Sequence, residues 1–105
     1  PGPPPPPPNP CRKTWFGGDA LTIALTAKTT GTCGEIYFYD RAAGYPVRTC
    51  HAKLTGCRVD GQAVSASYTC LFSRPPVEGR QGKITMTCGG GRLTARTASG
   101  LFTLR

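Results

Sequence analysis

The stretch ALTIALTAK (residues 20–28) decides the fold class of this chain of 105 residues. Leu21, Ile23 and Leu25 fall on one side of an extended backbone, and Thr22 and Thr26 fall on the other. Alternation with a period of two residues is typical of a β-strand that buries one face and exposes the other. The stretch therefore predicts a strand at the edge of a hydrophobic core.

Similar segments follow in both directions along the chain. Further strands are predicted by CGEIYFYD (33–40), PVRTCHAKL (46–54), AVSASYTCLF (63–72), KITMTC (83–88), RLTARTA (92–98) and LFTLR (101–105). Asp60-Gly61 and Gly89–Gly91 supply the residues that tight hairpin turns need, and SRPPVEGRQG (73–82) is typical of a loop. No segment of useful length has helical periodicity. We therefore predict an all-β fold, a small antiparallel β-sandwich or barrel of about seven or eight short strands.

The tripeptide Tyr68-Thr69-Cys70 resembles the Tyr-x-Cys of strand F in immunoglobulin domains. The resemblance implies an immunoglobulin-like sandwich topology. The chain departs from that family because it has no cysteine in residues 20–28, and its single tryptophan, Trp15, precedes that strand.

Six cysteines are spread along the chain. A zinc site favours two close pairs of cysteines, but the narrowest gap here, between Cys50 and Cys57, holds six residues. We therefore expect three disulfides, each contributing about 2–4 kcal/mol to a small core, and no metal or other cofactor. Fifteen pairings are possible, and disulfides indicate an oxidising, extracellular setting. The cysteines are Cys11, Cys33, Cys50, Cys57, Cys70 and Cys88.

Eight of the eleven prolines lie in the first ten positions. A run of this kind forms a polyproline II rod that rises about 3.1 Å per residue, so ten residues reach roughly 30 Å. We expect a polyproline II arm at residues 1–10 and a disulfide-stapled β domain at residues 11–105. The arm is interpreted as a stalk or as an assembly element that docks on a neighbouring copy. Its rod consists of Pro3, Pro4, Pro5, Pro6, Pro7 and Pro8.

A proline rod next to a cysteine-rich head resembles the hydroxyproline-rich glycoproteins of plant and green-algal extracellular matrix. The resemblance implies hydroxylated or glycosylated prolines and a head that takes part in matrix assembly. No apolar run is long enough to cross a bilayer, and no basic and apolar leader is present, so we expect the mature part of a secreted protein. The only asparagine, Asn9, precedes a proline, which excludes N-linked glycosylation.

Thirteen lysines and arginines against five acidic residues give a net charge of +8. Such a charge favours acidic partners, or simply solubility. Lys83, Arg92 and Arg96 are predicted on the outward face of one hairpin, interleaved with threonines, where they would bind carboxylate, sulfate or phosphate groups. Because this hairpin lacks the aromatic side chains of a nucleic-acid platform, acidic polysaccharide is favoured over nucleic acid.

Aromatic residues are concentrated in the first half of the chain. Trp15, Tyr37, Tyr39 and Tyr45 are candidates for a docking surface, because aromatic ridges bind polyproline II segments and also stack on sugars. An arm that docks on the aromatic surface of the next copy would build a head-to-tail filament, since such a contact does not close on itself.

Catalytic residues are sparse. His51 is the only histidine and follows Cys50, so an oxidised Cys50 leaves no Cys/His nucleophile. Glu35 and Arg48 would complete a single-histidine acid–base site, but nothing in their spacing requires them to converge. The sequence therefore favours a non-catalytic extracellular structural or adhesion module. The alternative is a cationic secreted module that binds acidic polysaccharide or other polyanionic surfaces, with a defence role.

Overall fold

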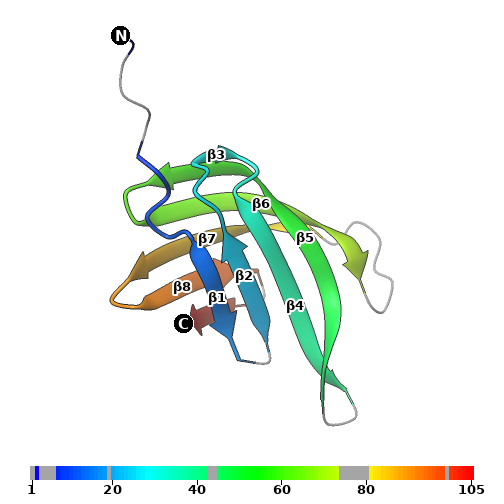
Figure 1. The fold of residues 1–105 in the computed structure, drawn as a ribbon. Coiled ribbons are helices and arrows are strands. Elements are labelled where there is room, and N and C mark those ends of the chain that lie inside the picture. Colours follow the sequence, from blue (N-terminus) through cyan, green and yellow to red (C-terminus); the bar gives the residue numbers. More distant parts are fainter. Residues whose placement is uncertain (1, 3–6, 19, 43–44, 74–80, 99) are drawn as a thin grey trace.

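A computed structural model describes residues 2, 7–18, 20–42, 45–73, 81–98 and 100–105, without the side chains of 40–42, 45–48 and 71–73. These residues form strands and turns and no helix, which confirms the predicted all-β class (Figure 1). The strands are β1 (Lys13–Gly17), β2 (Leu21–Leu25), β3 (Thr30–Gly31), β4 (Gly34–Ala42), β5 (Tyr45–Asp60), β6 (Ala63–Ser73), β7 (Gln81–Gly89), β8 (Arg92–Thr97) and β9 (Gly100–Leu104).

The strands form an antiparallel meander that closes on itself. Their order in the sheet is β1-β2-β4-β5-β6-β7-β8-β9, and the two-residue β3 pairs with β5. Closure is made after β9, where the Phe16 amide donates to the Arg105 carbonyl at 2.8 Å and the Arg105 amide donates to the Phe16 carbonyl at 2.9 Å. The small antiparallel β-fold is as expected. Its connectivity differs from that of an immunoglobulin domain. Apart from β3, successive strands of the described sheet pair with one another, and no Greek-key crossing occurs among them.

Two predicted hairpin turns have the expected backbone. Gly61 has a φ of 60° between β5 and β6, and Gly90 and Gly91 have φ values of 60° and 76° between β7 and β8. Both loops hold two residues, since Asp60 pairs with Ala63 and Gly89 pairs with Arg92. In the β7–β8 loop, the left-handed backbone of Gly90 and Gly91 matches the twist of the flanking strands. The register of this hairpin is therefore set locally.

Strand β5 is longer than the predicted segment, because its pairing continues through two irregularities. The register with β6 shifts between His51 and Ala52 and again between Thr55 and Arg58, and Gly56 between them has a φ of 59°. Bulges of this kind bend a strand and increase its twist. They let one 16-residue strand curve around the barrel.

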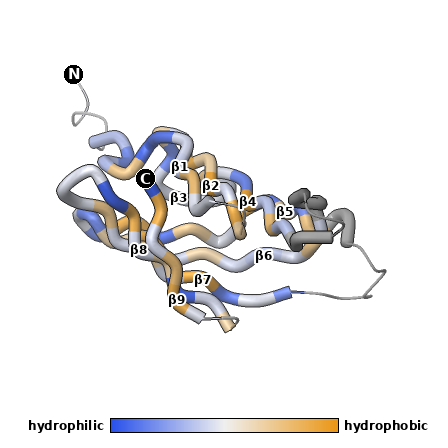
Figure 2. The backbone as a smooth tube through the Cα atoms, turned by 90° about the horizontal axis from the view of Figure 1, so that it is seen from below, coloured by the Kyte–Doolittle hydropathy of each residue, from blue (hydrophilic) through white to orange (hydrophobic). Residues whose placement is uncertain are grey.

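The interior is filled by the apolar half of each alternating pattern. Along β2, β7 and β8 every second side chain is buried, and the hydropathy colours alternate along these strands (Figure 2). A closed sheet of about eight strands has an interior just wide enough for side chains to fill. The largest fully buried side chains are Leu21, Ile23, Ile36, Leu54, Ile84, Met86, Leu93 and Leu104.

Tyr68, the tyrosine of the immunoglobulin-like tripeptide, packs inside the barrel rather than bracing a corner. Its ring lies 5.5 Å from that of Phe38 and opposite Gly82 of β7. A Cβ added to Gly82 would stand 2.7 Å from the Tyr68 hydroxyl oxygen. Glycine at this position therefore makes room for the aromatic ring.

Asn9, the second-last residue of the predicted arm, is packed against the body of the protein. Asn9 has no exposed surface; its amide donates to the Ala27 carbonyl at 3.0 Å, and its Oδ1 accepts from the Cys11 amide at 2.9 Å. Pro7 and Pro8 are exposed, whereas Pro3–Pro6 of the predicted rod lie outside the described residues.

All six cysteines are paired, as predicted, with the connectivity Cys11–Cys88, Cys33–Cys57 and Cys50–Cys70. The last two join neighbouring elements in the region of β4, β5 and β6, with separations of 24 and 20 residues. Cys11–Cys88 spans 77 residues and ties the segment before β1 to β7. Of the three disulfides, Cys11–Cys88 is therefore the one that links the start of the chain to the last three strands.

Candidate functional site

The predicted basic hairpin has the geometry that the sequence indicated. Lys83 on β7 and Arg92 and Arg96 on β8 are exposed. The alternate residues of these strands are buried in the core: Ile84, Met86, Cys88, Leu93 and Ala95. Arg96 lies opposite Thr85, and Arg92 lies opposite Gly89. The outward positions of the two strands are completed by exposed Thr87 and Thr94, which are also cross-strand neighbours. We call the surface formed by Lys83, Thr85, Thr87, Arg92, Thr94 and Arg96 the basic face.

Neither sequence nor structure offers the basic face an acidic neighbour on its own strands. The segments 61–73 and 81–105, which contain β6 to β9, hold no aspartate or glutamate. Beside the face, β6 presents Ser65 and Ser67, which lie opposite Thr85 and Lys83. Among the described residues, none of the three cations forms an ion pair. Their charge is therefore uncompensated within this part of the sheet.

Trp15 does not belong to a docking surface. It is 5% exposed, because it lies opposite Ile23 of β2 and faces the core in the same phase. Its Nε1 donates to the Cys11 carbonyl at 2.8 Å, and the Lys13 Nζ stands 4.3 Å from the ring centroid. The neighbouring Phe16 points outward instead and is 60% exposed. The indole is a structural element that fixes the start of β1.

Tyr37, one of the tyrosine candidates, is already in contact with neighbouring side chains. Tyr37 and Tyr39 are half-buried on β4, and the side chain of Tyr45 lies outside the described residues. Tyr37 stacks on His51 of β5, with ring centroids 4.4 Å apart and planes 9° apart. One face of the Tyr37 ring is thus covered by an intramolecular partner.

Glu35 joins Tyr37 and His51 in a cluster that sequence reasoning did not bring together. The Tyr37 hydroxyl donates to Glu35 Oε2 at 2.7 Å, and His51 Nε2 lies 3.6 Å from Glu35 Oε1. The contacts follow from strand register, because Tyr37 pairs with His51 and Glu35 pairs with Lys53. The side chains remain partly exposed, at 27% for His51 and 40% for Glu35.

The cluster stabilises the ionised form of Glu35. The hydrogen bond from Tyr37 is the largest cause that lowers the pKa of this carboxyl below its ordinary value, and the charges of His51 and Lys53 act in the same direction. Burial is the second-largest cause and acts in the opposite direction, but the net effect is a lowered pKa of Glu35. Glu35 is therefore a fixed carboxylate at neutral pH, oriented by two neighbouring rings.

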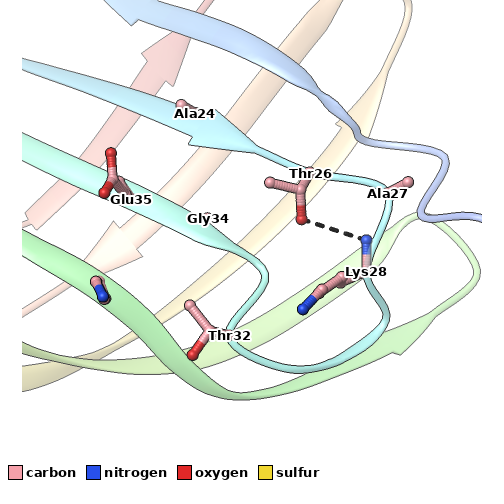
Figure 3. A pocket seen from close by; sticks show the side chains of 8 residues that line it. Ala24, Thr26, Ala27, Lys28, Thr32, Gly34 and Glu35 are labelled. Carbon is pink, nitrogen blue, oxygen red and sulfur yellow. Dashed lines mark hydrogen bonds between the residues drawn. The ribbon is translucent and has the colours of Figure 1, made fainter.

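A pocket of about 530 Å³ lies beside the cluster on the outer face of the barrel (Figure 3). Residues of β2, of β4 and of the loop between them form most of its wall, and β5 contributes Lys53. Glu35 stands at one end, while Lys28 and Thr32 come from the connecting loop at the other (Figure 3). The pocket combines carboxylate, ammonium and hydroxyl groups with an apolar floor.

Glu35 and His51 converge, whereas the third member of the acid–base set considered from sequence, Arg48, has a side chain outside the described residues. The Glu35–His51 separation of 3.6 Å exceeds a hydrogen bond. Tyr37 covers the imidazole on one side. The described geometry orients the imidazole by stacking and charge.

Two properties of the described residues bear on membranes and metals. No described helix has the length and apolar character of a membrane span. Within the same residues, no three His, Cys, Asp or Glu side chains are grouped to hold a metal ion.

Comparisons with known proteins give no family for this chain. A scan against protein-family models, a search of curated proteins and a search of solved structures each found no match. Function is therefore argued from the surfaces described above.

Proposed function

We propose that this protein is a non-catalytic extracellular structural or adhesion module that binds acidic polysaccharide through the basic face. The observation that carries the proposal is the uncompensated row of Lys83, Arg96 and Arg92, interleaved with threonine hydroxyls and free of acidic residues on β6 to β9. Lysine and arginine bind carboxylate and sulfate groups by charge-assisted hydrogen bonds, and threonine hydroxyls donate to or accept from sugar hydroxyls.

The cations are arranged as a line, which suits a polymer better than a single small anion. Arg96 pairs with Thr85, two residues after Lys83 on β7, and Arg92 pairs with Gly89, six residues after Lys83. At about 3.4 Å per residue, the three charges lie at about 0, 7 and 20 Å along the strand direction. An extended polyanion that follows the strands would contact all three charges together.

Three disulfides support an extracellular setting, because such bonds persist in oxidising compartments. The sequence of the first eight residues supports a rod that separates the barrel from whatever precedes it. A stapled barrel on a stiff arm is suited to display a binding face away from a surface.

Retention on immobilised polygalacturonate and on heparin tests the proposal. The variant Arg92→Gln/Arg96→Gln removes two charges from the basic face, and Arg12→Gln/Arg58→Gln removes two exposed charges elsewhere. The two variants have the same net charge, so any difference in elution reports position. We expect the first variant to elute at clearly lower salt than the wild type and the second to stay close to it.

Equal shifts for the two variants would contradict the proposal. That result would mean that net charge alone governs retention and that the basic face serves solubility. Circular dichroism and thermal unfolding of both variants check that the barrel is intact, which is expected because all four side chains are exposed.

The proline arm remains a stalk or a head-to-tail assembly element in this proposal. Because Asn9 is buried in the body, the informative deletion removes residues 1–8 and leaves Asn9 in place. Light scattering of the truncated and full chains then separates the two roles. Loss of multimers supports assembly, and unchanged size supports a spacer.

A further inference from the structure

The pocket beside Glu35 is hollow because small side chains occupy its floor. Ala24 lies in an outward-facing row between Thr14 of β1 and Glu35 of β4, and Ala27 follows in the loop. Gly34 begins β4 so close to β2 that an added Cβ would collide with the Ala24 carbonyl oxygen. The backbone approach and the two alanines create a concave surface of about 530 Å³, a size within the range of small-ligand sites.

The two ammonium groups at the pocket differ in their surroundings. Lys53 lies opposite Glu35 across the β4–β5 pair, and its charge helps to lower the pKa of Glu35, whereas Lys28 stands at the other end of the pocket (Figure 3). Lys28 and Lys53 are exposed, and neither forms an ion pair with any described residue. The Lys28 side chain extends toward Thr32 across the loop end of the pocket (Figure 3). The Lys28 amide donates to Thr26 Oγ1 at 3.3 Å, and Thr26 Oγ1 donates to the Cys33 carbonyl at 3.1 Å. The loop that carries Lys28 is thus held in place.

Glu35 supplies an oriented acceptor at the other end. Its carboxylate is held by the Tyr37 hydroxyl at 2.7 Å and faces His51 at 3.6 Å. An ionised carboxylate has about four acceptor positions, so Glu35 retains capacity for ligand hydroxyls. A bare anion such as sulfate would meet Glu35 as a repelling charge, and a neutral sugar would leave Lys28 without a partner.

From this arrangement we infer that the pocket binds a single hexuronate unit, a pyranose ring with one carboxylate. The ligand carboxylate pairs with Lys28, the hydroxyls at the other end of the ring contact Glu35 and Lys53, and an apolar C–H face of the ring rests on Ala24. The inference rests on the proposed function for the source of such units, an acidic polysaccharide. It assigns a second site on β2, β4 and β5, separate from the basic face on β7 and β8.

Titration of the full chain with D-glucuronate, followed by ¹H–¹⁵N correlation spectra, tests this site. We expect saturable shifts at the amides of Thr32, Gly34 and Glu35 at millimolar ligand. Methyl glucoside, which lacks the carboxylate, and sodium sulfate, which lacks the ring, should each fail to saturate these shifts. Sulfate reproducing the glucuronate shifts would overturn the inference, because it would reduce the site to a charge effect.

Steric block of the floor gives the second test. Ala24→Leu fills the pocket without altering charge and should weaken glucuronate binding at least tenfold. Thr14→Leu, at the position opposite Ala24 on β1 but outside the pocket, is the matched control and should bind as the wild type does. If Ala24→Leu does not fold, Ala27→Leu in the exposed loop serves instead. Wild-type affinity in a folded blocked variant would overturn the inference.

The two sites fail separately. In Arg92→Gln/Arg96→Gln, the glucuronate titration should be unchanged, whatever happens to polymer retention. A normal titration with unaltered polymer retention would remove the basic face and keep the pocket. Lost retention with no response of Thr32, Gly34 and Glu35 in the wild type would remove the pocket and keep the basic face.

Discussion

The outer surfaces of β2–β4–β5 and of β7–β8 carry similar residue types but organise them differently. On the first surface, Glu35, Tyr37 and His51 contact one another across strands. On the second, Lys83, Arg92 and Arg96 stand apart and have no acidic neighbour on their strands. The first surface therefore combines acidic and basic groups, whereas the second carries basic groups without acidic ones.

The two regions also differ in how they are held. Cys33–Cys57 and Cys50–Cys70 brace the strands around the first surface, whereas Cys11–Cys88 is the only disulfide that reaches β7, β8 or β9. The β2–β4–β5 surface, whose side chains contact one another, is thus also the surface with disulfides between nearby segments. The exposed basic face depends on strand pairing and on one long-range bond.

Removing the Cys11–Cys88 disulfide should lower the stability of the protein the most, because this bond closes the longest of the three loops. By loop-closure entropy, Cys11→Ser/Cys88→Ser is expected to lower the free energy of unfolding by about 4.5 kcal/mol for the 77-residue separation. Cys33→Ser/Cys57→Ser, with a separation of 24 residues, should lower it by about 3.4 kcal/mol. Urea titrations of both variants measure the difference. The reverse order would show that local bracing matters more than loop length.

Gly82→Ala should have the next largest effect, because it disturbs the start of β7. The new Cβ would stand 2.7 Å from the Tyr68 hydroxyl oxygen, so the ring must move within a packed core. Overpacking of this kind costs about 1–3 kcal/mol. Thermal unfolding measures the loss, and Gly89→Ala, whose added Cβ meets only the Gln62 side chain at 3.7 Å, is the control. A Gly82→Ala variant as stable as the control would refute the packing argument.

Tyr37→Phe should lower the free energy of unfolding by a smaller amount, and only at a pH where Glu35 is ionised in the folded protein. The substitution removes the hydrogen bond that does most to lower the pKa of Glu35. Because the folded-state pKa of Glu35 lies below its unfolded value, the associated stability is present above the ordinary glutamate pKa and is lost as pH falls through the folded value. Glu35 is partly exposed, so we expect a loss of only about 0.5 kcal/mol at pH 7.

Unfolding curves of wild type and Tyr37→Phe between pH 7 and roughly pH 3 check this prediction. The difference between the two proteins should shrink as the medium becomes more acidic. A gap that widens toward low pH would contradict the assigned protonation state.

Arg96→Gln should have the smallest effect on stability, which would distinguish the basic face from the contacting side chains around Glu35. Arg96 is exposed and unpaired among the described residues, so its removal should change the free energy of unfolding by less than about 0.5 kcal/mol. Urea titration measures this value. A substantial loss would show that the basic face has contacts within the protein and is not reserved for a partner.

The basic face was predictable from sequence because its geometry is local. Alternation along KITMTC and RLTARTA fixes which side chains point outward, and Gly90 and Gly91 fix the register of the hairpin through a two-residue loop. Every residue of the face follows from these two observations. The same alternation predicted the burial of Leu21, Ile23 and Leu25.

The cluster at Glu35 was not predictable, because its contacts depend on the register between β4 and β5, which is irregular. Tyr37 meets His51 only in the register that β4 and β5 adopt, and that register shifts between Phe38 and Tyr39. Trp15 illustrates a related difficulty. A short strand with one indole does not show which face is buried until its partner, β2, is known. Closure of the barrel by Phe16 and Arg105 likewise has no signal in composition.

The Cys11–Cys88 bond also determines how the protein responds to mechanical load. Tension applied to the proline arm enters the barrel at Cys11 and passes through sulfur to Cys88, so the strands between these residues are shielded from extension. A pull between the arm and Arg105 would strain only β8, β9 and the pair of hydrogen bonds that closes the barrel. In the proposed role as a tethered adhesion module, the protein would release only a short length of chain under force and would retain most of its fold.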